Sequence, residues 1–402
     1  ADLWYAAADG EYDNLCRFEV IELVAADLVP DDEDIYDTML VCKRKRGQDN
    51  HVIKHKIRCV LCGNQMIASA KRGESKTTVD LRTHAPAVRC SSIKHAMAVG
   101  VCLNMRQRDF DVVAAYLQGV LIGRRVFARA PLYYRKFDER GIELVWRLRR
   151  PLYGGPDAGR VWYNTFSDYM IRRETITPFK RSHYEPCLFT HVDDSSIASR
   201  TSDANAPTAR RINITLYVDD GRGWDNCPEI ADPFYTRLAA AFALTLDTDG
   251  LHFSLGMDIS IGDGWVKICS STYIKGLCKR WLDGDVQDYD QVYTPADTHL
   301  LEFYETALLT KGDGFNETEY RSLVGGLMWP APTTRPDCLF CVGVLARALT
   351  FPTFDLFKCA KRVLIFMGQT ANDGILYSAA AHDASRLVAW SDSDWATRRS
   401  TT

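Results

Sequence analysis

The sequence contains no long apolar run, and no stretch approaches the roughly 20 hydrophobic residues that a membrane-spanning helix needs. It also lacks an opening basic segment followed by an apolar one, the pattern of a secretory signal peptide. The chain starts at Ala1 rather than at Met, so we expect it to be a segment of a longer open reading frame.

Regular cysteine spacing is missing as well. The 13 cysteines are scattered, which favours free thiols in a reducing compartment over a disulfide framework. Two Cys-x-x-Cys pairs occur, Cys59 with Cys62 and Cys338 with Cys341, but each lies in an apolar stretch without a turn glycine. A four-cysteine zinc site is therefore a weaker interpretation than buried free thiols.

An overall excess of positive charge, which many nucleic-acid-binding proteins have, is absent, since the net charge is -3. Residues 43–58 nevertheless form a basic patch in which Asp49 is the single acid. Such a run is more often a solvated face than a phosphate contact. The length of 402 residues and the hydrophobic content of 46% allow two or three domains with a large core.

The spacing of apolar residues predicts strands and helices mixed along the chain, followed by a helical block. The predicted strands are residues 38–45, 52–61, 187–192, 212–218, 252–261, 264–270 and 387–390. The predicted helices are residues 91–104, a segment within 151–175, 232–243, 317–329, 336–349 and 353–368. Residues 193–209 indicate a polar loop, and residues 284–315 indicate an irregular connection.

Two adjacent acids, Asp219 and Asp220, come directly after an apolar strand, and Gly221 beyond them indicates a tight turn. Neighbouring carboxylates repel each other, and a bound cation would offset that repulsion. Asp111 stands in a second short apolar run. If both strands lie in one sheet, the three carboxylates can hold two hard divalent ions, an arrangement that serves phosphoryl transfer. For an isolated Asp-Asp pair the alternative is a solvated turn.

At these residues the chain resembles the reverse transcriptases of copia-type LTR retrotransposons, from about Trp4 to Thr402. The resemblance is specific because many short motifs follow one another in the same order. Phe110-Asp-Val-Val-Ala-Ala-Tyr-Leu-Gln-Gly119 and Tyr217-Val-Asp-Asp220 are two of them. The others are residues 56–65, 85–89, 152–154, 162–163, 185–189, 255–256, 320–325, 334–337 and 391–396.

The resemblance implies an α+β, right-hand polymerase fold with fingers, an antiparallel-sheet palm backed by helices, and a helical thumb. Fingers and palm would occupy residues 1–283, a connection 284–315 and the thumb-like region 316–378. Residues 387–402 would be the truncated start of a ribonuclease H domain, in which Asp392 matches the first acid. The remaining acids of that domain are missing from this chain, so we do not expect it to cleave RNA.

The implied activity is RNA-directed DNA polymerisation, in which dNTPs are added to a primer 3′ end on an RNA or DNA template. Asp111, Asp219 and Asp220 would be the catalytic carboxylates, holding two Mg²⁺ or Mn²⁺ ions together with the backbone carbonyl of Val112. Tyr116 would be the steric gate, because an aromatic ring beneath the sugar leaves no room for a 2′-hydroxyl. The alternative for Tyr116 is an ordinary core aromatic residue.

The resemblance also implies a dNTP-binding set. Arg58 would contact the triphosphate, since a guanidinium fork suits phosphate oxygens. Lys45 or Arg46 would do so from the opposite strand, and the register between these two stays open. Gly154 would allow close backbone approach to the nucleotide or template, or would simply be a turn glycine. Tyr217 belongs to the same expected set.

Two further sets are implied for nucleic acid. Leu255 and Gly256 match the family's primer grip. Lys358, Lys361 and Arg362 share one predicted helical face and could follow template–primer phosphates, although a solvated face explains them equally well. The expected partners are an RNA template, a DNA primer and dNTPs, with a tRNA as one candidate primer. We expect a cytoplasmic retrotransposon particle and the nucleus as locations, and no secretion.

The sequence departs from the family pattern in three places. Cys62 stands where the family usually has Arg, Val113 replaces a common Lys, and Gly155-Pro156-Asp157 replaces Leu-Lys-Gln. These departures keep a second hypothesis open, in which the chain is a catalytically inactive retrotransposon relic or a host-adopted nucleic-acid-binding module. The intact set of three acids favours the polymerase.

Overall fold

The computed structural model describes residues 2–46, 51–73, 83–121, 124–172, 177–193, 210–247 and 253–379. The chain divides into two compact units, each with its own core. The first unit comprises Ala1–Ser92 and Gln107–Thr248, and the second comprises Ile93–Arg106 and Asp249–Thr402. Within the described ranges, no helix is long and apolar enough to span a bilayer.

The first unit contains a six-stranded sheet with the order β1-β7-β5-β2-β3, and β6 also pairs with β7. Its strands are β1 (Ile21–Ala25), β2 (Ile35–Arg46), β3 (Val52–Leu61), β5 (Phe127–Arg129), β6 (Lys136–Phe137) and β7 (Glu143–Leu148). β2 and β3 form an antiparallel ribbon and confirm the strands predicted at 38–45 and 52–61. The turn predicted between them lies outside the described residues.

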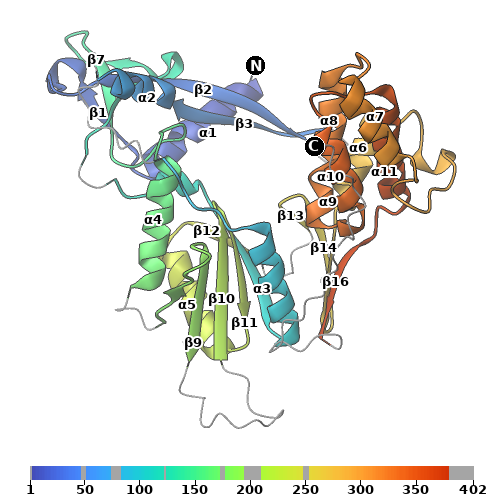
Figure 1. The fold of residues 1–402 in the computed structure, drawn as a ribbon. Coiled ribbons are helices and arrows are strands. Elements are labelled where there is room, and N and C mark those ends of the chain that lie inside the picture. Colours follow the sequence, from blue (N-terminus) through green and yellow to red (C-terminus); the bar gives the residue numbers. More distant parts are fainter. Residues whose placement is uncertain are drawn as a thin grey trace. The chain divides into compact units, whose positions relative to one another are not determined.

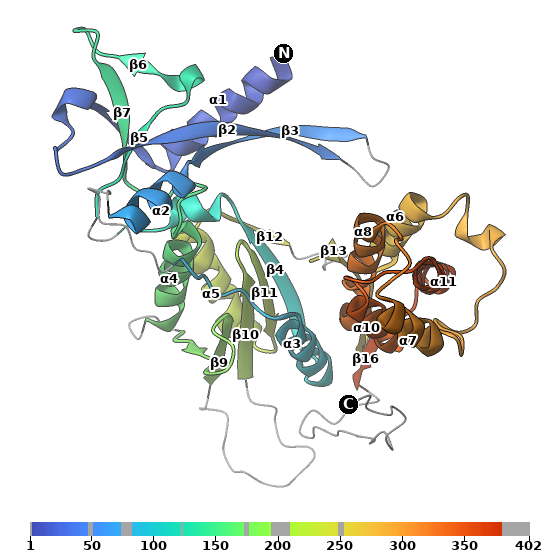
Figure 2. The same cartoon turned by 45° about the horizontal axis from the view of Figure 1, so that its top comes forward.

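Two helices accompany this sheet, α1 (Asp2–Arg17) and α2 (Gly63–Arg72). The sequence pattern did not indicate α1, because its buried face carries Ala8 and Glu11 rather than a continuous row of large apolar residues. Leu15 of α1 is fully buried in the same core as Trp146 of β7. Figure 2 shows α1 lying alongside β2 and β3.

A second six-stranded sheet of the first unit has the order β12-β4-β11-β10-β9-β8. Its strands are β4 (Arg106–Val112), β8 (Lys180–Arg181), β9 (Leu188–Asp193), β10 (Arg210–Tyr217), β11 (Asp220–Asp225) and β12 (Leu244–Asp247). The helices α4 (Ala158–Ile171) and α5 (Pro228–Ala241) pack on one face of it, as Figure 1 shows. Short 3-10 helices connect these elements: η1 (Ala26–Leu28), η2 (Ala115–Gln118) and η3 (Leu132–Tyr134).

The helix α3 (Cys90–Cys102) confirms the prediction at 91–104 and leads into the second unit. That unit has a four-stranded antiparallel sheet made of β13 (Phe253–Ser254), β14 (Met257–Gly262), β15 (Trp265–Cys269) and β16 (Gly374–Ser378). Its helices are α6 (Ser271–Trp281), η5 (Val286–Asp288), α7 (Leu300–Thr310), α8 (Glu317–Leu327), α9 (Pro330–Thr333), η6 (Pro336–Cys338), α10 (Leu339–Arg347) and α11 (Phe354–Gln369).

The interpretation of residues 284–315 as irregular was wrong for α7. Its apolar side chains Leu300 and Ala307 are buried in the core that α8, α10 and α11 share, and this packing stabilises a helix whose sequence pattern is weak. α6, which precedes the predicted connection, contributes Ile274 and Leu277 to the same core. The boundaries expected for fingers, palm, connection and thumb stay predictions.

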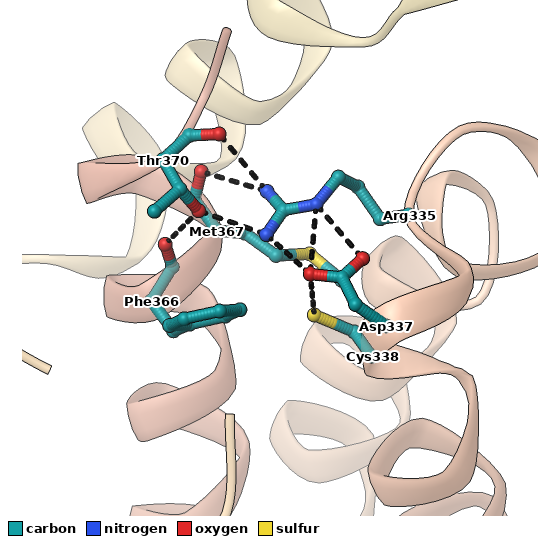
Figure 3. Close-up of polar contacts among 6 residues, drawn as sticks. All are labelled: Arg335, Asp337, Cys338, Phe366, Met367 and Thr370. Carbon is teal, nitrogen blue, oxygen red and sulfur yellow. Dashed lines mark hydrogen bonds and ion pairs between the residues drawn. The ribbon is translucent and has the colours of Figure 1, made fainter. Parts of the chain in front are cut away.

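A buried arginine ties η6 to the end of α11 (Figure 3). The side chain of Arg335 is 1% exposed, and its Nε and Nη2 donate to the two carboxylate oxygens of Asp337 at 3.0 and 2.7 Å. Nη1 donates to the carbonyls of Met367 and Thr370, and Nη2 also donates to the Thr370 hydroxyl at 2.8 Å. The guanidinium lies 5.2 Å from the ring centre of Phe366. All three of its nitrogens are therefore bonded within this network.

The mixture of helices with largely antiparallel sheets confirms the predicted α+β class. Strands and helices predicted at 187–192, 212–218, 232–243, 264–270, 317–329, 336–349 and 353–368 all have counterparts in the structure. The predicted loop at 193–209, the strand at 387–390 and Asp392 lie outside the described residues, apart from the end of β9.

Candidate active site

The hairpin of β10 and β11 carries two of the three predicted catalytic acids. Tyr217 and Asp220 pair across it, so Val218 and Asp219 form its two-residue turn. Val218 has φ of 58°, a left-handed conformation that costs a β-branched residue on the order of 1–3 kcal/mol. The buried indole of Trp162 donates to the Val218 carbonyl at 2.6 Å and holds the turn in this conformation.

The strand β4 brings the third acid to the same place. β4 lies beside β11 in the sheet, as Figure 2 shows, and Asp111 stands near its end. The Val112 amide donates to the Asp219 carbonyl at 2.9 Å, which joins the two acid-bearing segments directly. Asp111, Val112 and Asp219 line one cavity of about 350 Å³, and Asp220 follows immediately at the start of β11.

The three carboxylates repel one another. Burial raises the pKa of Asp111, and the negative charge of Asp219 raises it further, while Lys56 and Lys45 act in the opposite direction. Burial also raises the pKa of Asp220, and both Asp219 and Asp111 add to that rise. Oxygen donors crowded in this way favour a hard divalent cation, because its charge would relieve their repulsion.

The turn after β4 is held by a buried amide. Gln118 donates from Nε2 to the carbonyls of Val113 and Ala243 at 2.7 and 3.0 Å, and its Oε1 accepts from the Ala243 amide at 2.8 Å. Ala114, between Val113 and η2, has φ of 51°. Sequence reasoning missed Gln118 as a positioning residue, although it lies inside the quoted motif at 110–119.

The walls of the cavity are aromatic and basic. Tyr116 of η2 and Tyr153 have ring centres 5.7 Å apart, and the Arg58 guanidinium lies 4.9 Å from the ring centre of Tyr153. Lys56 joins Arg58 in the lining, and burial together with Arg58 and Lys45 lowers its pKa. Tyr116 and Arg58 had been predicted as site residues, but Lys56 and Tyr153 had not. Period-two alternation along β3 could have identified Lys56, because it faces the same side as Arg58.

The other predicted dNTP residues whose side chains the structure describes do not line this cavity. Lys45 lines the neighbouring one, Tyr217 is the exposed last residue of β10, and the side chain of Arg46 lies outside the described residues. Gly154 has φ of 80°, and a Cβ there would meet the Leu61 carbonyl at 2.3 Å. A side chain at position 154 would therefore clash with β3, which explains why a glycine stands there. The nucleotide-binding role of each of these residues remains a prediction.

Two predicted sets lie in the second unit. Leu255 and Gly256 form the turn between β13 and β14, with φ of 47° and 81°. On α11, Lys358 pairs with Asp355 at 2.8 Å, and the ammonium of Lys361 lies 5.3 Å from the ring centre of Phe357. Arg362 donates to the hydroxyl of Thr294 at 3.5 Å. These contacts leave the primer-grip and phosphate roles as predictions.

Two of the three departures from the family pattern, those at Asp157 and Cys62, can be followed in the structure. Asp157 does not place an unpaired acid in the cavity, because its carboxylate accepts from Arg124 at 2.7 Å and both side chains are largely buried. Cys62 occupies the N-cap position of α2 without a side-chain capping bond, and burial raises the pKa of its thiol. Burial likewise raises the pKa of Cys59 and Cys338 to about 12, so a thiolate is unfavourable at both.

Within the part of the chain that the structure describes, no group of three or more His, Cys, Asp or Glu side chains is arranged to hold a metal ion alone. Mg²⁺ in nucleotide sites is usually bound by one or two carboxylates together with substrate phosphates and water. Asp111 and Asp219 offer such carboxylates in one cavity, so the donor set fits an ion that arrives with a phosphate-bearing substrate.

Comparison with known proteins identifies the class. A model of the family described as reverse transcriptase (RNA-dependent DNA polymerase) matches residues 19–297. The chain belongs to this family. Enzymes of this family generally use divalent metal ions. The predicted class of enzyme, an RNA-directed DNA polymerase, is therefore confirmed at the level of the family.

Relatives of this chain include Pol polyproteins of transposons, which confirms the predicted resemblance to copia-type retrotransposons. The retrovirus-related Pol polyprotein from transposon RE1 of Arabidopsis thaliana is 28% identical over 92% of this chain and 23% of its own length. That from transposon TNT 1-94 of Nicotiana tabacum is 25% identical over 85% of this chain and 24% of its own length. The chain thus spans about a quarter of these curated relatives.

A solved structure of apo telomerase from Candida tropicalis aligns with 93% of this chain and 68% of its own, at 8% identity. The TM-score of 0.35 is too low to bear on the fold.

Proposed function

We propose that this chain carries the polymerase active site of a copia-type retrotransposon Pol polyprotein and adds dNTPs to a primer 3′ end on an RNA or DNA template. The observation that supports this most is the single cavity in which Asp111 and Asp219 meet Arg58 and Tyr116. The lining thus combines carboxylates with a guanidinium, the groups that suit a metal-bound triphosphate.

Asp111, Asp219 and Asp220, with the carbonyl of Val112, would hold two Mg²⁺ ions, or Mn²⁺ in their place. Such ions make the attacking hydroxyl a better nucleophile and stabilise charge on the leaving phosphate oxygens. The protein's own contribution is positional. The Trp162 bond to the turn and the amide of Val112 fix the acids before substrate arrives, and fixed groups need no reorganisation during reaction.

The remaining walls would select and orient the nucleotide. Arg58 and Lys56 would bind phosphate oxygens, and the stack of Arg58 on Tyr153 restrains the guanidinium. Tyr116 would exclude a 2′-hydroxyl. Residues outside this cavity would contact the template and primer phosphates. The cytoplasmic retrotransposon particle and the nucleus remain the proposed locations.

Primer extension tests the proposal directly. The purified chain, an RNA template annealed to a DNA primer, dNTPs and Mg²⁺ should yield extended product. Asp219→Asn should lower the rate by at least about 100-fold, because it removes a metal-binding charge. Asp168→Asn is the matched control, since Asp168 is exposed on α4 and does not line the cavity.

Equal extension by wild type and Asp219→Asn would refute the assignment of the acids. Template–primer binding by a wild-type chain that extends nothing under Mg²⁺ or Mn²⁺ would instead favour the inactive relic or host-adopted binding module.

A further inference from the structure

A buried arginine follows Asp220 by two residues on β11. Arg222 is 3% exposed, and among the residues that the structure describes its Nη1 has no hydrogen-bond partner. Thr215, which pairs with Arg222 across the β10–β11 register, is 1% exposed, and its hydroxyl likewise has no partner among these residues. An unpaired guanidinium nitrogen in the protein interior costs free energy. Another interaction must therefore offset that cost.

Two glycines show which face of the sheet Arg222 occupies. A Cβ added at Gly221 would clash with the ring of Phe110, which belongs to the core beneath α4 and α5. Gly223 faces the same core. Because successive residues of a strand alternate between the two faces, Asp220 and Arg222 lie together on the other face.

The neighbouring strand β4 contributes acids to that same face. Phe110 and Val112 of β4 are buried in the core beneath α4 and α5, so Asp109 and Asp111 alternate to the opposite side. β4 lies beside β11 in the sheet (Figure 2). This face of the two strands therefore brings their carboxylates together with the guanidinium of Arg222.

The charges on this face act on one another. Burial lowers the pKa of Arg222, and the negative charges of Asp109 and Asp220 raise it. Burial raises the pKa of both acids, and Arg222 acts against that rise at each of them. A guanidinium keeps its charge in proteins. Arg222 therefore supplies positive charge to the acids whether or not a metal ion is bound.

We propose that Arg222 is a built-in countercharge of the metal site and lowers the affinity of the acids for a divalent cation. Without it, crowded carboxylates would hold such an ion tightly before any substrate arrived. With it, firm binding requires further oxygen ligands from the phosphates of a nucleotide. Arg222 does not line the cavity of the acids, so it acts through its charge rather than by contact with substrate. The inference rests on the proposed function, since it concerns ions that Asp111, Asp219 and Asp220 would hold.

Titration of the full chain with MnCl₂ in the absence of nucleotide tests the inference, with free Mn²⁺ measured by electron paramagnetic resonance. Arg222→Gln and Arg222→Ile remove the charge and should tighten Mn²⁺ binding at least about fivefold. Arg222→Lys keeps the charge and should stay within about twofold of wild type. Asp219→Asn should weaken binding, which locates the measured ion at the acids.

Arg237→Gln is the matched control for the loss of one positive charge. Arg237 is half-buried on α5, which packs on the other face of the sheet, and it donates to the Thr177 hydroxyl at 2.8 Å. Its replacement should leave the affinity for Mn²⁺ unchanged.

Mn²⁺ affinity that is equal in wild type and the two neutral variants of Arg222, or weaker in those variants, would overturn the inference. Circular dichroism shows whether each variant folds. A neutral variant that folds only after Mn²⁺ is added supports the inference, because the ion then replaces the lost charge. A neutral variant that stays unfolded with Mn²⁺ would overturn it, since Arg222 would be required for structure alone. The titration requires no catalysis, so its failure is separate from the failure of primer extension that would refute the proposed function.

Discussion

Tyr116 lines the same cavity as Arg58, Asp111 and Asp219, so its ring borders the space that a nucleotide would occupy there. Its ring is half-buried in the cavity lining, and its nearest ring neighbour is Tyr153. Burial and the charge of Asp219 raise the pKa of Tyr116, so its hydroxyl stays protonated at neutral pH. An uncharged ring in the cavity lining suits steric exclusion.

Replacing Tyr116 by Val should therefore relax sugar selection. We expect ribonucleotide incorporation relative to deoxynucleotide incorporation to rise at least about tenfold, because the space for a 2′-hydroxyl opens. The measurement is the ratio of kcat/KM for one NTP and its dNTP on the same primer. An unchanged ratio would mean that Tyr116 is a core aromatic residue.

Asp109 gives a second prediction at the scale of one residue. It is 6% exposed on β4, and burial raises its pKa to about 6 despite the opposing influence of Arg222 and Gln107. Its folded pKa exceeds the ordinary value of 3.8, so its contribution to stability is fully present below about pH 4. That contribution is lost as pH rises through about 6, where the buried carboxyl ionises.

Asp109→Asn should remove this pH dependence while keeping an acceptor for Gln107. Relative to wild type, the unfolding free energy of the variant should rise between pH 4.5 and pH 7.5 by up to ~2 kcal/mol. Urea denaturation of both proteins at the two pH values measures the difference. A difference that does not vary with pH would contradict a raised pKa at Asp109.

At the scale of the element, the β10–β11 turn combines strain with a strong restraint. Val218 is held at positive φ, and Trp162 donates to its carbonyl. Asn tolerates this conformation, so Asn at position 218 would relieve the strain and keep the hydrogen bond from Trp162 to the backbone carbonyl.

Val218→Asn should accordingly raise the unfolding free energy by about 0.5–1 kcal/mol, with the loss of some apolar contact setting the lower end. Chemical denaturation provides the measurement. Val120→Asn is the control, because Val120 is 52% exposed and is not among the residues with positive φ. A similar gain in both variants would show that strain at Val218 is not the cause.

At the scale of the whole molecule, the second unit depends on its own core and on the network of Arg335. That guanidinium is buried and satisfies the carbonyls at the end of α11. Arg335→Met should lower the unfolding free energy of this unit by roughly 3 kcal/mol, because buried carbonyls and Asp337 lose their donors.

Hydrogen exchange read by mass spectrometry can localise that loss. Faster exchange is expected in α8, α10 and α11, and unchanged exchange in β9, β10 and β11. Arg347→Met, at an exposed arginine of α10, should leave both sets unchanged. Equal acceleration in both units would contradict the view that each has an independent core.

The sequence predicted most of the helices and strands, because the spacing of apolar residues within one segment is enough to indicate its type. Short apolar, strand-like runs predicted β3 and β10, and helix-like spacing predicted α3, α4 and α11. The helices α1 and α7 were not predicted, because packing rather than an apolar stripe stabilises them. In α1, Glu11 and Ala8 occupy buried positions, and in α7 only Leu300 and Ala307 are buried.

By itself, the sequence determined the family and the α+β class, because those rest on residue types in a fixed order, and it predicted Asp111, Asp219 and Asp220 as the catalytic acids. Only the tertiary structure decided which cations and rings share a cavity with them. Lys56 and Tyr153 reach it through strand register and a loop that passes β3, and Lys45 falls in the neighbouring cavity. Register and helix docking depend on contacts between distant segments, and no local pattern encodes those contacts.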